Sequence, residues 1–245
     1  MKETDAIFAE LRQRHDEAGR SGDTVRVSID TKATVKVGPF SRGGYSRTGT
    51  EGADHDFQAG KLTPFGIFLP GEDRLDLYFT PSKVTSDFMA DSLEDWWGRN
   101  KERLAAKRTL LLDLDNGPEN HSRRSQFLKR MIEFAWATQV TVMLCYYPPY
   151  HSKYNPIERC WGILENYWRG ELLDSEQAVL GYAGRMTYNG KHPRVQKVEK
   201  EYKTGVRLSR KELDELEKFI QRKDGLKKWF VVIPPAPPSP DEPIP

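Results

Sequence analysis

Two apolar runs of this chain end in an acidic residue, and a third apolar run is followed by a helix that begins near one. Residues 25–30 alternate between apolar and polar and end at Asp30, and residues 110–115 are almost continuously apolar and end at Asp115. Glu158 lies in the first turn of an amphipathic helix. A buried carboxylate is costly unless it is paired, hydrogen bonded or bound to a cation. The pattern therefore predicts an α/β fold in which carboxylates from three elements form a metal site.

The length and composition fit one sizeable α/β core. The chain has 245 residues, of which 37% are hydrophobic, and it contains two cysteines, too few for a disulfide framework. No apolar stretch is long enough for a signal peptide or a membrane span. We therefore expect a cytoplasmic protein that does not contact a membrane.

Hydrophobic periodicity predicts a group of strands followed by alternating helices and strands. Residues 1–22 have helical spacing, residues 24–38 indicate a hairpin or a bent long strand, and residues 75–79 indicate another strand. Residues 41–60 lack periodicity and indicate an exposed loop. The later elements are predicted as helix 85–104, strand 109–114, a helix after residue 120, strand 140–145 and helices 156–168 and 210–222. This order predicts a mixed sheet covered by helices.

Positive charge is concentrated near the C-terminus. Residues 185–228 contain 14 Lys and Arg against 7 Asp and Glu, a net charge of +7, whereas residues 1–184 contain 24 against 27, a net charge of −3. Such a segment fits contact with a polyanion, and it equally fits an ordinary solvated helix face. The basic residues that we select as candidate phosphate contacts in this segment are Arg194, Lys197, Lys200 and Lys203.

Each acid also has an interpretation without function. Asn155 is a good N-cap and Pro156 suits the first position of a helix, so the helix dipole alone would favour Glu158. Asp30 and Asp115 could be hydrogen-bonded turn residues. Together, three carboxylates without nearby Cys or His suit Mg²⁺ or Mn²⁺ better than zinc. Two such ions about 3.5–4 Å apart can assist an in-line phosphoryl displacement.

The three acids stand in the motifs Ser28-Ile-Asp30-Thr-Lys32, Asp115-Asn-Gly-Pro-Glu-Asn120 and Tyr147-Pro-Pro-Tyr-His-Ser-Lys153-Tyr-Asn155-Pro-Ile-Glu158. These motifs resemble those of DDE-type insertion-sequence transposases, within the mariner and retroviral-integrase superfamily, and most closely the ISAzo-type family. The resemblance extends over nearly the whole chain, from the Ile-Asp-Thr-Lys strand to Trp229.

The resemblance implies an RNase H-like fold, with a mixed five-stranded sheet flanked by helices and a charged C-terminal extension. It maps Asp30, Asp115 and Glu158 onto the catalytic, metal-binding triad, with Asp113 as a competitor for the second position. The implied cofactor is Mg²⁺ or Mn²⁺, with two ions when DNA is bound. The implied activity is metal-dependent DNA strand cleavage and strand transfer. A catalytically idle DNA-binding remnant and an RNase H-like nuclease are the alternatives.

The resemblance also implies partners and a division of the chain. DNA is the expected partner, with Lys32, Arg42 and Lys153 as candidate phosphate contacts near the triad. The part before the first strand is too short for the helix-turn-helix of complete transposases, so we expect a separately encoded helix-turn-helix subunit, a homodimer and a bacterial, nucleoid-associated location. The expected segments are a helix or linker at 1–24, the catalytic domain at 25–190, a basic subdomain or extension at 191–232 and a Pro-rich tail at 233–245.

Overall fold

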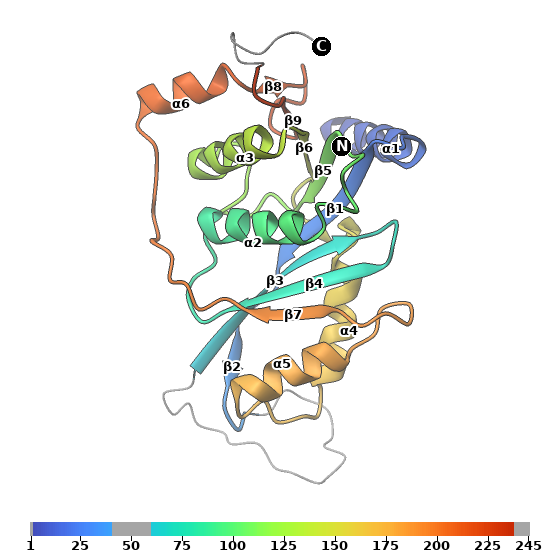
Figure 1. The fold of residues 1–245 in the computed structure, drawn as a ribbon, viewed down its shortest axis with the longest axis vertical. Helices are drawn as coiled ribbons and strands as arrows, with labels where there is room; N and C mark the ends of the chain where they lie inside the picture. The colour runs from blue at the N-terminus through green and yellow to red at the C-terminus, as the bar shows by residue number, and fades with distance from the viewer. Residues whose placement is uncertain (1, 41–59, 238–245) are drawn as a thin grey trace.

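The alternation of residues 24–31 produces the strand β1, which lies in the middle of the β-sheet in the computed structural model (Figure 1). Val27 and Ile29 are buried in the main hydrophobic core on one face of the sheet. Ser28 and Asp30 alternate with them and therefore point to the opposite face. Both polar side chains are nevertheless buried, because helices cover that face as well.

The structure describes residues 2–40 and 60–237. Their helices and strands follow this order: α1 (Lys2–Arg20), β1 (Thr24–Thr31), β2 (Val35–Val37), β3 (Gly60–Leu69), β4 (Arg74–Thr80), α2 (Ser86–Arg99), β5 (Thr109–Leu114), α3 (Ser125–Thr138), β6 (Thr141–Tyr146), the 3₁₀ helix η1 (Ser152–Tyr154), α4 (Glu158–Trp168), α5 (Glu176–Arg185), β7 (Arg194–Lys197), α6 (Arg210–Glu217), β8 (Gln221–Arg222) and β9 (Phe230–Ile233).

The sheet is mixed, as predicted. Its strand order is β7-β4-β3-β1-β5-β6-β9-β8, with β2 paired to β3. The pairs β1–β5, β5–β6 and β4–β7 are parallel, and the other pairs are antiparallel. Within the described residues the sheet has nine strands, four more than the five that were expected.

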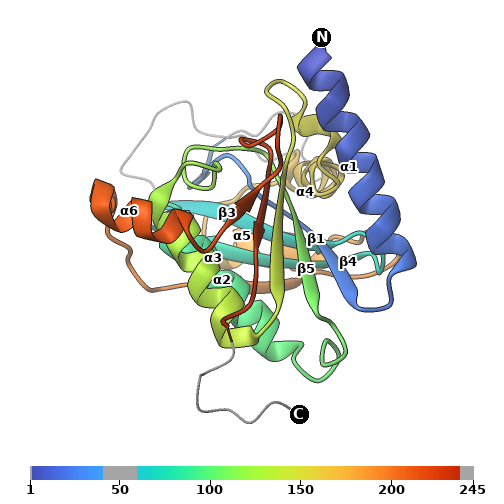
Figure 2. The same cartoon turned by 90° about the horizontal axis from the view of Figure 1, so that it is seen from above.

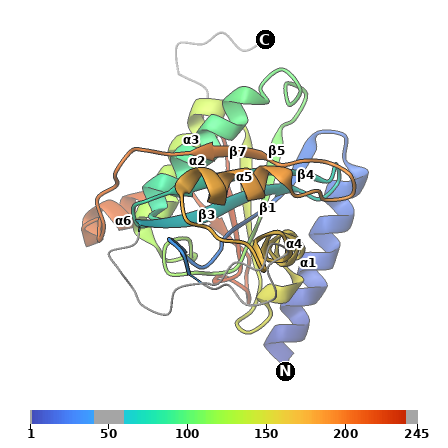
Figure 3. The ribbon, with the colours of Figure 1, turned by 90° about the horizontal axis from the view of Figure 1, so that it is seen from below.

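Helices cover both faces of this sheet. Figure 1 shows α2 above strands β3 and β4, with α4 and α5 below them. Seen from above, α1 lies on the opposite side of the sheet from α2 and α3 (Figure 2). From below, α5 crosses in front of β3 and β4 (Figure 3). Two clusters of buried apolar side chains, one on each face of β3 and β4, hold the layers together.

Most predicted elements are present, but β3, α5 and the C-terminal strands β7, β8 and β9 were not predicted. Strand β3 contains Pro64 and Gly66, two residues that usually argue against a strand. The carbonyl of Pro64 accepts a hydrogen bond from the backbone N–H of Lys32 (3.0 Å). The position where Pro64 lacks an N–H group therefore faces β1, at the point where the pairing of β1 with β3 ends at Thr31. Strands β1 and β2 both pair with β3, which makes residues 24–37 the bent strand of the two predicted alternatives.

The segment predicted as a basic C-terminal extension contributes strands to the main sheet. Strand β7 adds to β4 at one edge, and β9 adds to β6 on the other side and in turn pairs with β8. The predicted helix 210–222 ends earlier, at Glu217, and Ile233 belongs to β9 instead of the tail. The domain boundary at residue 190 stays a prediction.

The tryptophans predicted to be core residues are buried: Trp96, Trp97, Trp161 and Trp168. Within the described part of the chain, we find no helix that is both long and apolar enough to span a membrane.

Candidate active site

Asp30 and Asp115 lie at the ends of two neighbouring strands. In the parallel β1–β5 pair, Ser28 lies opposite Asp113. Two residues further along each strand, this register brings Asp30 level with Asp115, at the carboxyl ends of β1 and β5. The sequence therefore positions two of the three predicted acids at one edge of the sheet, where α/β proteins commonly form their sites.

A buried hydrogen-bond network joins the start of α4 to β1. The Ser28 hydroxyl donates to Asn155 Oδ1 (2.5 Å) and accepts from the backbone N–H of Ile157 (3.0 Å). Asn155 Nδ2 in turn donates to the carbonyl oxygen of Ile29 (3.2 Å). We call these contacts the Ser28–Asn155 network. Because Glu158 directly follows Ile157, the network fixes the third acid relative to the strand that bears Asp30.

This network corrects one prediction about the helix start. Asn155 was expected to cap the helix with its side chain, but its amide is bonded to β1, and α4 begins at Glu158 with Ile157 at the N-cap and no side-chain cap from that residue. The hydroxyl of Ser28 supplies an acceptor for the backbone N–H of Ile157 instead. A side chain from a distant strand thus performs the role that a local cap was predicted to perform.

Close packing of α4 on β3 brings a further residue into contact with Asp30. Gly66 lies opposite Asp30 in the β1–β3 pair, and a Cβ atom on it would be 2.6 Å from Ile157 and 2.7 Å from Trp161. The absence of a side chain at Gly66 lets the Trp161 ring lie against the strand. Trp161 Nε1 then donates a hydrogen bond to Asp30 Oδ2 (2.8 Å), which orients this carboxylate.

The three predicted acids share one electrostatic environment. The pKa of Asp30 is raised to about 7, chiefly because burial removes the carboxylate from water. The negative charge of Asp115 is the next cause, and that of Glu158 raises the pKa further. The hydrogen bonds from Trp161 and from the backbone of Thr31 oppose the increase. The repulsion means that Asp30 responds to the charges of both other acids.

The side chain of Asp115 is held by the turn that follows it. Asn120 Nδ2 (2.9 Å) and the backbone N–H of Gly117 (3.2 Å) both donate to its Oδ1 atom. The hydroxyl of Tyr146 donates to the carbonyl oxygen of Asn120 (2.7 Å), which ties the turn to β6. Asp115 therefore is a hydrogen-bonded turn residue, which was one interpretation of its sequence, and it also lies level with Asp30.

Asp113, the competitor for the second position, is already paired. Its Oδ1 atom contacts His15 Nε2 (2.7 Å), and its Oδ2 atom accepts from Arg26 Nε (2.7 Å). The side chain is fully buried beneath these partners. By contrast, Asp30, Asp115 and Glu158 make no ion pair among the described residues, which favours Asp115 as the second member.

The donor chemistry of this site suits a hard divalent cation. The three unpaired carboxylates offer oxygen ligands only, and a cation would relieve the repulsion that raises the pKa of Asp30. In residues 2–40 and 60–237, no three His, Cys, Asp or Glu side chains are already arranged around a position that could hold a metal ion. The residues thus fit Mg²⁺ or Mn²⁺ chemically, and convergence of their side chains on one ion stays a prediction.

The predicted phosphate contacts near the triad differ in availability. Lys32 forms an ion pair with Glu165 (3.1 Å). Lys153 is exposed in η1, with its ammonium 5.2 Å from the centre of the Tyr154 ring. Arg42 lies outside the described residues. Lys153 is therefore the more accessible of the two candidates that the structure describes.

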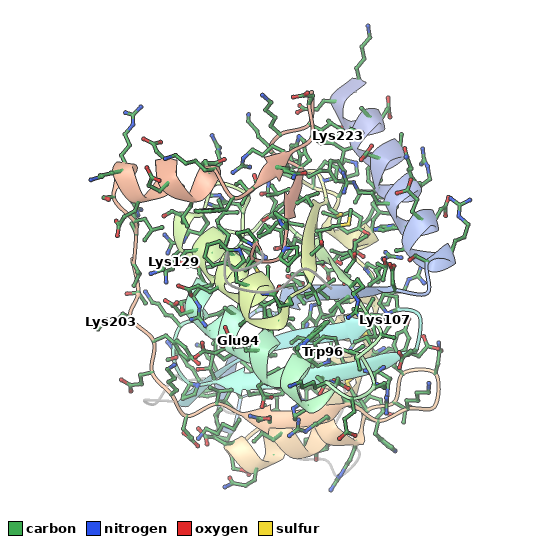
Figure 4. All side chains as sticks on the ribbon, turned by 45° about the horizontal axis from the view of Figure 1, so that its top comes forward. Glu94, Trp96, Lys107, Lys129, Lys203 and Lys223 are labelled. Atoms are coloured by element: carbon green, nitrogen blue, oxygen red, sulfur yellow. The ribbon has the colours of Figure 1, made fainter. Side chains whose placement is uncertain are left out.

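The basic candidates of the C-terminal segment lie on the other side of the sheet centre. Strand β7, which carries Arg194 and Lys197, is separated from β1 by β4 and β3. Lys197 pairs with Glu176 (2.5 Å), and Lys200 pairs with a carboxylate of α2 (2.6 Å). Arg194 and Lys203 make no ion pair within the described residues, and Figure 4 shows Lys203 at the outer edge of the molecule.

Four residues that support the site were missed from the sequence: Ser28, Gly66, Asn155 in its observed role and Trp161. A signal existed for Ser28, because it lies two residues before Asp30 and therefore on the same face of the strand. Trp161 follows Glu158 at helical spacing but was assigned only to the core. Gly66 gave no usable signal, since the strand that contains it was not predicted.

These features define the class of protein. A mixed sheet whose two central parallel strands end level at Asp30 and Asp115, with Glu158 on a helix packed against β1 and β3, has an RNase H-like fold. Residues 1–235 match the family described as the Rhodopirellula transposase DDE domain, and the chain belongs to this family of DDE transposase domains. The transposase recognised from the motifs is thereby confirmed at the level of the family.

Solved structures agree with this fold. The chain is similar to the Mos1 transposase in its paired-end complex with the left transposon end, with a TM-score of 0.51, 14% identity and coverage of 74% of this chain and 52% of that chain. A Mos1 mariner paired-end complex with Mn gives a TM-score of 0.51, 14% identity and coverage of 74% and 53%. The chain thus spans about half the length of these transposases. No curated protein sequence matches it.

Proposed function

We propose that this domain performs divalent-metal-dependent DNA strand cleavage and strand transfer, with Asp30, Asp115 and Glu158 as the metal-binding residues. The observation that carries the proposal is the electrostatic coupling of three carboxylates that lack cationic partners, at the ends of β1 and β5 and the start of α4. Membership in a DDE transposase family supports it, because such transposases use divalent metals.

The residues of this chain would hold the three carboxylates in position for metal binding. Asp30 is oriented by the Trp161 indole, and Asp115 is oriented by Asn120 and Gly117, so both carboxylates are held before any substrate arrives. The Ser28–Asn155 network holds Glu158 at the start of α4. Bound divalent ions would supply activation of the attacking hydroxyl and stabilisation of the leaving oxygen.

The proposal extends to the partner and the location. The Mos1 complexes are complexes of a transposase with transposon ends, and we propose by similarity that DNA is the partner of this chain. Lys153, Arg194 and Lys203, whose side chains make no ion pair among the described residues, would contact phosphates. A homodimer, a separately encoded helix-turn-helix subunit and a DNA-associated, cytoplasmic location belong to the same proposal.

Cleavage of plasmid or oligonucleotide DNA with Mg²⁺ or Mn²⁺ tests the proposal. The unmodified domain should cut DNA only with the metal present, and Asp30→Asn, Asp115→Asn and Glu158→Gln should each abolish cutting while leaving the fold intact. Cutting without joining of the freed ends to target DNA would indicate the nuclease alternative. Binding without any cutting would indicate the idle remnant.

A further inference from the structure

A groove beside the proposed active site combines aromatic and cationic side chains. It has a volume of about 510 Å³ and lies between α1 and the segment that leads into α4. Figure 2 shows this segment reaching toward the N-terminal half of α1. We call this cavity the Phe8–Tyr154 groove. The lining residues used in the argument are Phe8, Arg12, His15, Arg26, Tyr147 and Tyr154.

One wall of the groove is a set of contacting rings. The ring centres of Phe8 and Tyr154 are 5.2 Å apart with nearly perpendicular planes, and Phe8 also contacts His151 at 5.5 Å. Tyr154 is 53% exposed, so it offers ring surface that no other part of the described protein covers. Exposed aromatic rings of this kind are the usual platforms for unpaired bases, because every base has a flat π surface.

The other wall is cationic and held in place from behind. Arg26 and His15 are bonded to the two oxygens of the buried Asp113, at 2.7 Å each. Arg12 adds an exposed guanidinium from α1, and Asp5 is the one acid among the lining residues. Guanidinium groups held in a fixed orientation are suited to holding a phosphate.

The groove adjoins the triad through the backbone. The N–H of Tyr147, a lining residue, donates to the carbonyl oxygen of Leu114 (2.9 Å), the residue before Asp115. Tyr154 ends the short helix that precedes Glu158. Arg26 lies on β1, on the same face as Asp30. The groove residues thus lie on, or next to, the elements that carry the three acids.

We propose that the Phe8–Tyr154 groove binds one unpaired nucleotide of the DNA strand next to the phosphate that is cut, with its base on the ring wall and its phosphate on the cationic wall. Its volume lies within the range of about 300–1,000 Å³ that is typical of small-ligand sites, and is too small for a duplex. The inference rests on the proposed function, because it assumes that DNA passes the triad.

The test compares two DNA probes in the absence of divalent metal, so that no strand is cut. One probe is a blunt duplex, and the other is the same duplex with a short single-stranded overhang that has 2-aminopurine as its first unpaired base. The protein should bind the overhang probe more tightly and should quench its fluorescence. Tyr154→Ala should weaken overhang binding by about 5- to 150-fold, the factor that corresponds to loss of one base stack, and should leave blunt-duplex binding unchanged.

Two matched controls accompany these measurements. Tyr150 lies in the same segment, is fully exposed and is not part of the groove, so Tyr150→Ala should keep the overhang preference. Arg12→Gln should reduce the salt slope of overhang binding by about 0.7, the value for one phosphate contact on a single strand. Arg20→Gln, on the same helix but outside the groove, should not change it.

Three results would overturn the groove proposal alone. The first two are equal affinity of the unmodified protein for both probes, and equal effects of Tyr154→Ala and Tyr150→Ala on overhang binding. The third is loss of the preference for the overhang probe when a free deoxynucleoside monophosphate is added, which would make a mononucleotide the ligand. Each of them leaves blunt-duplex binding and metal-dependent cleavage in place. Failure of the proposed function is recognised differently, by a protein that neither binds the blunt duplex nor cuts DNA with metal.

Discussion

Replacement of Ser28 by alanine probes the network that positions Glu158. The Ser28 hydroxyl is fully buried and has two partners: it donates a hydrogen bond to Asn155 Oδ1 and accepts one from the Ile157 N–H. The Ser28→Ala variant removes both contacts without adding volume. Asn155 is also buried, so water cannot replace the lost partners unless the site opens.

The expected loss of stability follows from these two contacts. A buried polar group left without a partner costs about 1–3 kcal/mol, so two such groups cost about 2–6 kcal/mol of unfolding free energy. The effect on cleavage is separate, because a displacement of about 1 Å in a reacting group can reduce a rate by about 100-fold. We therefore expect Ser28→Ala to lower both the unfolding free energy and the cleavage rate per folded molecule.

Urea unfolding and a cleavage assay at a temperature where the variant stays folded measure the two effects. Ser92→Ala is the matched control, since the hydroxyl of Ser92 is buried in α2 and has no hydrogen-bond partner among the described residues. Its loss should change stability by less than about 1 kcal/mol. A Ser28→Ala variant as stable as Ser92→Ala, or one that is less stable yet cuts DNA at the full rate, would refute the positioning role of the network.

Three further predictions concern the site and the basic surface. Between pH 3.8 and about 7, the raised pKa of Asp30 keeps this carboxyl protonated in the metal-free folded protein but not in the unfolded chain. The unfolding free energy should therefore fall as pH rises through this window, by at most about 4 kcal/mol. Urea unfolding at a series of pH values should show a smaller fall for Asp30→Asn. Gly66→Ala should destabilise the protein by about 1–3 kcal/mol by overpacking against α4, whereas Gly98→Ala, in open space on α2, should stabilise it by about 0.5–1 kcal/mol; equal thermal shifts would contradict this packing. Combined substitution by alanine of the four basic candidates in residues 185–228 should flatten the salt dependence of duplex binding, by about 0.9 in slope for each lost phosphate contact. An unchanged slope would show that this segment is ordinary solvated surface. The positions substituted in this last variant are Arg194, Lys197, Lys200 and Lys203.

The strand periodicity and the acid positions were visible in the sequence because burial imposes them directly. The alternation of residues 24–31 and the apolar run of residues 109–114 predicted β1 and β5, and the acids at their ends followed from that. Strand β3 escaped prediction because Pro64 and Gly66 have roles that depend on their neighbours. Pro64 lies where pairing with β1 ends, and Gly66 makes room for α4.

The pairing of charged groups could not be predicted, because it depends on contacts between distant segments. Lys32 lies beside the site in sequence but pairs with Glu165, and Lys200 is tied to α2. The sequence favours Asp115 over Asp113 only because Asp115 directly precedes a turn. The structure adds that Asp113 is paired with His15 and Arg26, contributed by α1 and β1. Local sequence therefore identifies candidate charges, while the fold decides which of them stay available.

Titration of the DNA-bound domain with Mn²⁺ tests the central claim most directly, with binding followed by calorimetry. The unmodified domain should bind the ion, and binding should be lost in Asp30→Asn, Asp115→Asn and Glu158→Gln. It should persist in Asp113→Asn, which keeps the size of the side chain, provided that thermal unfolding shows a folded variant. Binding that survives in Asp115→Asn and disappears in folded Asp113→Asn would contradict the assignment of the second acid. Binding that survives in all three triad variants would contradict the metal site itself.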